Sequence, residues 1–122
     1  MNITERRTRE RQMNRTIKPR DLRSMLESRQ EVTILDVRRK ADYDADHEVL
    51  LNAEWHDPEK VSASSRGLPK DKEIVIYCAR GGSVSNMVLD QLLSRNIQAQ
   101  YIEGGIAAWK EAGGKIIVKP SL

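Results

Sequence analysis

The chain has 122 residues, of which 39% are hydrophobic and 32% charged, and its formal net charge is +3. This length suits one domain and leaves little room for a second, and no apolar run approaches the roughly 20 residues of a membrane-spanning helix. The single cysteine excludes a disulfide within the chain and favours a reducing compartment, so we expect a cytoplasmic protein without a membrane partner.

The N-terminal end of the chain is strongly basic and has no clear apolar stripe. We expect residues 1–15 to form a basic arm, disordered or helical, that keeps the protein soluble. Basic segments also bind nucleic acid or anionic membranes. However, no aromatic side chain interleaves these charges as a surface for stacking bases would require, so nucleic acid is not an expected partner.

The first half of the domain alternates between predicted helices and strands. Residues 19–29 carry apolar side chains at helical spacing, and Pro19 suits the first turn of a helix. The apolar, β-branched run 32–37 predicts a buried strand. Three more elements are predicted here: helical turns at 39–45, a short strand at 50–53, and a helix that begins at Asp57-Pro58 and ends before Gly67.

The second half repeats this pattern around the strongest predicted strand, at residues 73–77. Cys78 follows directly, and a loop of mainly small residues leads into an amphipathic helix that runs to about Arg95. The remaining predicted elements are a strand at 99–102, a short helix from Ile106 that Gly113-Gly114 closes, and an edge strand at 116–118.

Strands separated by helices and short loops predict a mostly parallel central sheet with helices on both faces. We therefore expect a three-layer α/β domain over residues 16–118, followed by a tail at 119–122. In such sheets, ligands bind at the carboxyl ends of the strands. Asp36 and Arg38 follow one predicted strand end and Cys78 follows another, so the candidate site is expected there.

The segment around Cys78 suits nucleophilic attack on an anionic substrate. Gly81 and Gly82 are free to adopt positive φ and turn backbone N–H groups inward, and the N-terminus of the helix near Ser83 points at the same place. Such N–H donors favour an anion and the reactive thiolate. Most free cysteines are inert core residues, but a core cysteine does not need this loop. A phosphate-binding loop without catalysis is another alternative, although the usual Gly-x-x-x-x-Gly-Lys-Ser/Thr motif is absent.

Three segments carry a further signal: Ile34-Leu35-Asp36-Val37-Arg38, Ile76-Tyr77-Cys78-Ala79-Arg80-Gly81 and Tyr101-Ile102-Glu103-Gly104-Gly105-Ile106-Ala107-Ala108-Trp109. In their order and spacing they resemble the single-domain rhodaneses, or thiosulfate sulfurtransferases. The resemblance covers roughly residues 16–114, and its most distinctive motif is Glu-Gly-Gly-Ile-x-x-Trp.

The resemblance implies a sulfurtransferase that uses no metal and no organic cofactor. Family members take sulfur from thiosulfate, or from a related donor, onto the loop cysteine as a persulfide, and a thiophilic acceptor such as cyanide or a protein thiol removes it. Carried over, Cys78 is the nucleophile, and Asp36 and Arg38 brace the loop, with an ordinary surface ion pair as the alternative. The implied substrate-binding loop is Ala79, Arg80, Gly81, Gly82, Ser83 and Val84.

Two segments depart from the family pattern. Where the family usually has Gly-His-Ile-x-Gly-Ala, this chain has Asp-His-Glu-Val-Leu-Leu-Asn-Ala at residues 46–53, so His47 is expected to be structural or exposed. Many members place Arg or Ser at the fifth position after the cysteine and Ser at the sixth, where this chain has Ser83 and Val84. The lower positive charge leaves thiosulfate, a less charged donor and a protein persulfide open as the natural donor.

Two other functions match parts of the pattern. A phosphatase or arsenate reductase of related fold needs Cys-x5-Arg, whereas the sixth residue after Cys78 is Val84 and the loop is one residue too short for phosphate. A non-catalytic sulfur-binding or regulatory module is the other alternative, and the presence of Cys78 argues against it. We therefore predict an enzyme that accepts sulfur from a small anionic donor. A domain of this size can stand alone, so we expect a monomer or weak dimer.

Overall fold

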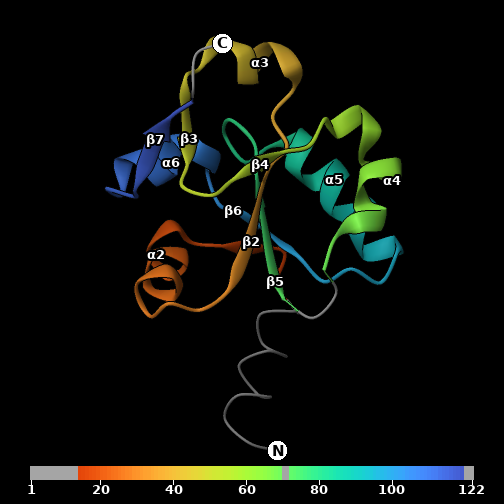
Figure 1. Cartoon of the computed structure of the whole chain (residues 1–122), viewed down its shortest axis with the longest axis horizontal. Helices are drawn as coiled ribbons and strands as arrows, with labels where there is room; N and C mark the ends of the chain where they lie inside the picture. Colours follow the sequence, from red (N-terminus) through yellow and green to blue (C-terminus); the bar gives the residue numbers. More distant parts are fainter. Residues whose placement is uncertain (1–13, 70–71, 120–122) are drawn as a thin grey trace, which may run out of the picture.

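The computed structural model describes residues 14–69 and 72–119 and contains one five-stranded parallel sheet (Figure 1). The strand order is β1-β6-β5-β2-β4, so the long strand β5 lies at the centre. Its strands are β1 (Thr16–Ile17), β2 (Val32–Asp36), β4 (Glu54–Trp55), β5 (Glu73–Tyr77) and β6 (Gln100–Ile102). Two other strands, β3 (Glu48–Leu50) and β7 (Ile116–Val118), form a separate antiparallel pair.

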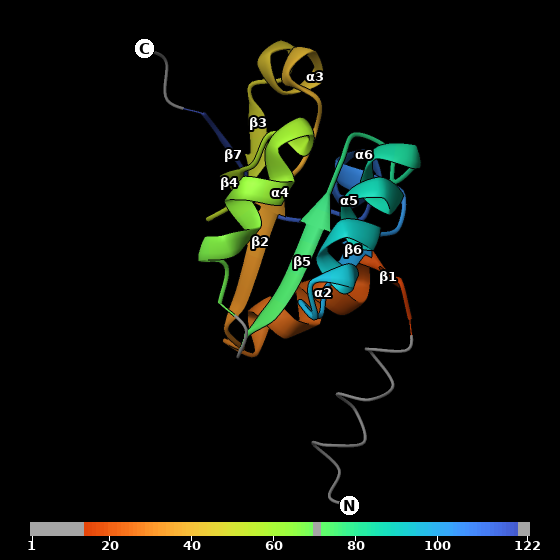
Figure 2. The same cartoon turned by 90° about the vertical axis from the view of Figure 1, so that its right-hand side faces the viewer.

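Helices cover both faces of the parallel sheet (Figures 1 and 2). One face carries α2 (Pro19–Glu27) and α6 (Gly105–Glu111), and the other carries α4 (Val61–Ser64) and α5 (Ser83–Ser94). The short helix α3 (Lys40–Ala45) lies beyond the carboxyl ends of the strands (Figure 1). The predicted three-layer α/β fold is therefore confirmed.

The alternation of side chains along β5 explains why the sheet is buried on both faces. Val75 and Tyr77 pack in the cluster that contains residues of α2 and α6, whereas Ile74 and Ile76 pack in the cluster that contains residues of α4 and α5. All four side chains are 2% exposed or less. A strand covered on both faces reads as a continuous apolar run, which is why the sequence signal for β5 was strong.

Three predicted elements differ in the structure. The strand expected at 50–53 is wrong, because Asn52 has a φ of 64° and forms a turn between β3 and β4. The helix expected from Asp57 is broken into α4 and two flanking 3-10 turns, η1 (Pro58–Lys60) and η2 (Ser65–Gly67). Strand β7 is formed as expected, but it pairs with β3 and not with the parallel sheet.

The predicted basic arm, residues 1–15, lies outside the described residues except for Asn14 and Arg15. These two residues continue the line of β1 along β6. The Tyr101 N–H donates to the Arg15 carbonyl at 3.0 Å, and the Gln100 side chain donates to the Asn14 carbonyl at 3.1 Å. Of the predicted tail, Lys119 is described and residues 120–122 are not.

Candidate active site around Cys78

Cys78 directly follows the carboxyl end of the central strand β5 and is 5% exposed. The backbone on both sides of it is held by neighbouring elements. The Val37 N–H donates to the Tyr77 carbonyl at 2.8 Å, and the Ile106 N–H at the start of α6 donates to the Cys78 carbonyl at 3.0 Å. The cysteine is therefore placed rigidly between β2 and α6.

Glycines make this close packing of backbones possible. Gly105 has a φ of 64°, and a Cβ at this position would lie 2.5 Å from the Cys78 carbonyl oxygen and 2.7 Å from that of Ala79. Gly81 has a φ of 69°, and a Cβ there would lie 2.7 Å from the backbone nitrogen of Gly104. The turn that contains Gly104 and Gly105 thus contacts the Cys78 region directly, with no room for side chains between them.

The predicted substrate-binding loop, residues 79–84, runs from Cys78 into the first turn of α5 and is called the Cys78 loop below. Its first helical hydrogen bond joins the Asn86 N–H to the Gly82 carbonyl at 3.2 Å. The first N–H groups of a helix have no partner within the helix and attract an anion. Helix α5 has 12 residues and begins at Ser83, inside the loop. Its first N–H donors therefore lie only a few residues after the cysteine.

The residues of the Cys78 loop differ in exposure. Ala79, Gly81 and Val84 are half-buried, whereas Arg80, Gly82 and Ser83 are exposed. In the described part of the chain, the Arg80 guanidinium makes no hydrogen bond or ion pair, so its charge is available to an approaching anion. Arg80 is the loop's one cationic side chain, because Ser83 and Val84 are neutral.

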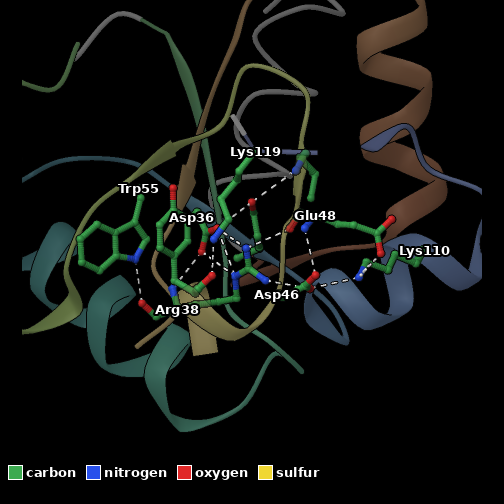
Figure 3. A network of polar contacts seen from close by, with 10 residues as sticks. Asp36, Arg38, Asp46, Glu48, Trp55, Lys110 and Lys119 are labelled. Atoms are coloured by element: carbon green, nitrogen blue, oxygen red, sulfur yellow. Dashed lines mark hydrogen bonds and ion pairs between the residues drawn. The ribbon is translucent and has the colours of Figure 1, made fainter. Parts of the chain in front are cut away.

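Asp36 and Arg38 form a buried ion pair at the end of β2 (Figure 3). Arg38 Nη2 lies 2.7 Å from Asp36 Oδ2, Arg38 Nε donates to both carboxylate oxygens, and each side chain is 1% exposed. The Tyr77 hydroxyl also donates to Asp36 Oδ2 at 3.0 Å. The pair therefore connects β2 to the residue that precedes Cys78.

The same arginine reaches the segment in which the chain departs from the family pattern (Figure 3). Arg38 Nη1 donates to Asp46 Oδ2 at 3.0 Å, and Arg38 Nη2 donates to the Glu48 carbonyl at 3.1 Å. Lys110 on α6 pairs with both acidic side chains, at 3.1 Å each. The network thus ties this segment to α6, whose first turn binds the Cys78 carbonyl.

Sequence reasoning named Asp36 and Arg38 as supports of the Cys78 loop. Apart from the bonds between these two residues, their side-chain hydrogen bonds in the described residues go to Tyr77, Asp46 and the Glu48 backbone, and none goes to residues 79–84. Any support that they give the loop is therefore indirect, through Tyr77 and α6.

Burial and charge act in opposite directions on the pKa values of this network. Burial alone would lower the pKa of Arg38, but the hydrogen bond and charge of Asp36 outweigh it and raise the pKa. Burial would raise the pKa of Asp46, but hydrogen bonds from the Glu48 N–H and Lys110, with the charges of Lys110 and Arg38, lower it. Burial and the Asp36 charge raise the pKa of Tyr77, so its hydroxyl remains a donor at neutral pH.

Sequence reasoning missed Tyr77, Asp46 and Lys110 as parts of this network. A tyrosine in an aliphatic buried strand was the available signal, because a buried phenol hydroxyl needs a partner. Asp46 and Lys110 are 64 positions apart and gave no local signal. His47 is exposed as expected, and its carbonyl accepts a hydrogen bond from the Lys119 N–H at 2.7 Å.

Within residues 14–69 and 72–119, no three His, Cys, Asp or Glu side chains are grouped so that they could hold a metal ion. No helix in these same ranges has the length and apolar character needed to span a bilayer.

Comparisons with known proteins agree with this architecture. The chain is 30% identical over 97 residues to the "Probable adenylyltransferase/sulfurtransferase MoeZ" of Mycobacterium tuberculosis, covering 77% of this chain and 24% of that protein. It is 30% identical over 103 residues to the uncharacterized protein slr1261 of Synechocystis sp., covering 84% of this chain and 55% of that protein. The chain thus spans about a quarter and about half of these two relatives.

A solved structure and a family model give the same result. The rhodanese-like domain protein of Staphylococcus aureus has a TM-score of 0.73 and 26% sequence identity, covering 87% of this chain and 99% of its own. The family model described as "Rhodanese-like domain" matches residues 18–112. Together with the parallel sheet and the cysteine at its central strand end, this match shows that the chain belongs to the family of rhodanese-like domains.

Proposed function

We propose that this protein is a sulfurtransferase that carries sulfane sulfur on Cys78. The observation that carries the proposal is the position of the chain's single cysteine, at the end of the central strand and directly before the glycine-containing Cys78 loop. Backbone contacts from β2 and α6 hold it, and the first N–H groups of α5 follow within the loop. Membership in the rhodanese-like family and a distant relative described as a probable sulfurtransferase support the same activity.

In the proposed reaction, sulfur moves in two displacement steps. The Cys78 thiolate attacks the outer sulfur of thiosulfate, a new S–S bond forms, and sulfite leaves with the electron pair of the broken bond. A thiolate acceptor, or cyanide, then attacks the terminal sulfur of the Cys78 persulfide, and the Cys78 thiolate leaves. Neither step requires a metal or an organic cofactor.

The Cys78 loop would contribute mainly backbone N–H groups to this reaction. The amides of residues 79–84 would bind the anionic part of the donor, and the exposed Arg80 would add one positive charge. Since Ser83 and Val84 are neutral, a protein persulfide or another less charged donor is a candidate beside thiosulfate. A reducing compartment keeps a lone thiol reduced, so we propose a cytoplasmic location. We also propose a monomer or weak dimer as the active form, because a domain of this size can fold alone.

The proposal is tested by intact mass spectrometry after incubation with thiosulfate or with a small-molecule persulfide. We expect a gain of one sulfur atom that cyanide or a thiol reverses and that Cys78→Ser abolishes. Because Cys78 is the only cysteine, the added sulfur needs no further mapping. If neither donor adds sulfur to a folded protein, the transferase proposal is wrong, and a non-catalytic domain or an enzyme of another class remains.

A phosphate-release assay separates the rival enzyme class. We expect no hydrolysis of an aryl phosphate, because Val84 occupies the position where a Cys-x5-Arg site would hold its arginine. Hydrolysis that Cys78→Ser abolishes would favour a phosphatase instead.

A further inference from the structure

Arg15 connects the N-terminal end of the described chain to the first turns of α5. Its backbone is fixed on β6, because its carbonyl accepts the Tyr101 N–H at 3.0 Å. Its side chain crosses to α5, where Nε and Nη2 donate to Asn86 Oδ1 at 3.3 and 3.1 Å. Nη2 also lies 2.9 Å from Asp90 Oδ1.

Asn86 passes this contact on to the Cys78 loop. Its side-chain Nδ2 donates to the Gly82 carbonyl at 3.2 Å, and its backbone N–H donates to the same oxygen at 3.2 Å. A continuous chain of hydrogen bonds therefore runs from Arg15 through Asn86 to Gly82, inside the loop that follows the cysteine.

The donor chemistry of Arg15 fixes which way the Asn86 amide points. A guanidinium only donates, so the Asn86 oxygen must face Arg15 and the NH2 group must face the Gly82 carbonyl. A trans peptide unit is planar, and its C=O and N–H point in opposite directions. With the Gly82 carbonyl held against α5, the Ser83 N–H points away from the helix, as the free N–H groups at a helix N-terminus do.

The exposure of the contact indicates what it contributes. The side chains of Arg15 and Asp90 are 43% and 67% exposed, and ion pairs of this kind add little to stability. A direction imposed on one loop amide, in contrast, acts on any anion that the loop binds. The contact is therefore suited to orienting the loop amide, whereas it adds little to the stability of the chain.

We propose that Arg15 is a positioning residue of the active site, which acts through Asn86 to orient the Gly82–Ser83 peptide for binding of the anionic donor. This inference rests on the proposed function of the Cys78 loop. Arg15 itself does not touch the reacting sulfur. The basic segment at the N-terminal end of the chain thus includes one residue with a role at the site.

Two readouts test the proposal, and only one of them needs sulfur transfer. The first is the steady-state kinetics of sulfur transfer from thiosulfate, in which KM and kcat are measured separately. The second is the ratio of Cys78 alkylation rates by iodoacetate, which is anionic, and iodoacetamide, which is neutral. Asn86→Ala is the central variant because it changes no charge, and Asp90→Asn is the control that leaves the Arg15–Asn86–Gly82 chain intact.

We expect Arg15→Ala and Asn86→Ala each to raise KM and lower the alkylation ratio by about three- to tenfold, the effect of about one hydrogen bond. Asp90→Asn should leave both readouts near those of the wild type. The double variant Arg15→Ala/Asn86→Ala should have the same KM and alkylation ratio as Asn86→Ala alone, because Arg15 acts through Asn86. Thermal unfolding of every variant shows whether the fold is retained.

Two results would overturn the positioning role. One is an Arg15→Ala protein with the KM and alkylation ratio of Asp90→Asn. The other is a double variant whose effects multiply, since this would mean that Arg15 acts through its charge alone. If the wild type takes sulfur from no donor, the proposed function fails, and the alkylation ratio still decides the role of Arg15.

Discussion

At the scale of single residues, two glycines allow the close backbone contacts around Cys78. Gly105 allows α6 to begin against the backbone of Cys78 and Ala79, and Gly81 allows the Cys78 loop to lie against Gly104. In both cases a backbone atom, and not a flexible side chain, occupies the place of the missing Cβ. The position of the cysteine therefore depends on residues that have no functional group of their own.

Gly105→Ala tests this dependence. The methyl group would lie 2.5 Å from the Cys78 carbonyl oxygen, and the left-handed backbone alone costs a non-glycine residue about 1–2 kcal/mol. We expect a lower free energy of unfolding in urea and slower alkylation of Cys78. Gly67→Ala is the matched control, because a Cβ at Gly67 meets no atom within 4 Å. Equal stability of the two variants would contradict this account of the turn.

The buried Asp36–Arg38 pair predicts a second effect at the same scale. Arg38→Met would leave the Asp36 carboxylate buried and without its cation, a change that costs about 3–5 kcal/mol in comparable pairs. Urea unfolding at neutral pH measures the loss. Lys40→Met, at the exposed Lys40–Asp44 pair, should change stability little. A similar small change for Arg38→Met would show that the pair is dispensable.

At the scale of elements, one network joins β2, the segment at residues 46–48 and α6. Arg38 lies two residues after β2, Asp46 lies in the segment and Lys110 lies in α6, and both cations contact Asp46 Oδ2. Since α6 also binds the Cys78 carbonyl, the network gives the divergent segment a structural route to the active site. The segment leads into β3, which pairs with β7.

The Asp46 carboxyl predicts a dependence of stability on pH. Its pKa in the folded protein lies below the ordinary 3.8, so its contribution is complete above that value and is lost as the pH falls through the folded-state pKa. We expect Asp46→Asn to destabilise the protein at pH 7 and to cost progressively less as the pH is lowered below 4. Urea unfolding at several pH values measures both. A deficit independent of pH would assign the effect to packing and not to charge.

At the scale of the whole molecule, the sheet is completed by the short strand β1 and the two residues before it. The Ile17 carbonyl accepts the Glu103 N–H at 2.9 Å, and the Ile17 side chain is 6% exposed in the core. Among the described residues, Asn14 is the first that contacts β6. The N-terminal end of the described chain therefore forms one edge of the domain.

Two truncations test where the domain begins. Removing residues 1–17 deletes β1 and the buried Ile17, so we expect a loss of at least about 2–5 kcal/mol, the usual cost of emptying one such core position. Removing residues 1–13 keeps the contacts from Asn14 onward, so the difference between the two truncated proteins measures what residues 14–17 contribute. Thermal unfolding of both proteins measures the difference. Equal losses would mean that β1 contributes little to the fold.

Much of the fold could be predicted because its signals are local. Each of these signals can be recognised within a short stretch of sequence: the continuous apolar run of β5, the helical spacing of apolar residues in α2 and α5, and the glycines in the turns after Cys78 and Ile102. Topology then placed the cysteine at a carboxyl strand end. The parallel sheet with helices on both faces followed from the same pattern, whereas the order of its strands came only from the structure.

Short and polar features were decided only by the folded chain. Strand β1 has two residues and β4 has two, and such elements take their stability from the strand beside them and not from their own sequence. The partners of Arg38 and Asn86 lie up to 71 positions away, so no local pattern could name them. Local periodicity and glycine preferences were enough to predict the parallel sheet, the position of Cys78 at a strand end and the loop that follows it. The contacts that hold this loop could be identified only in the folded chain, because they join segments that are distant in sequence and meet after folding.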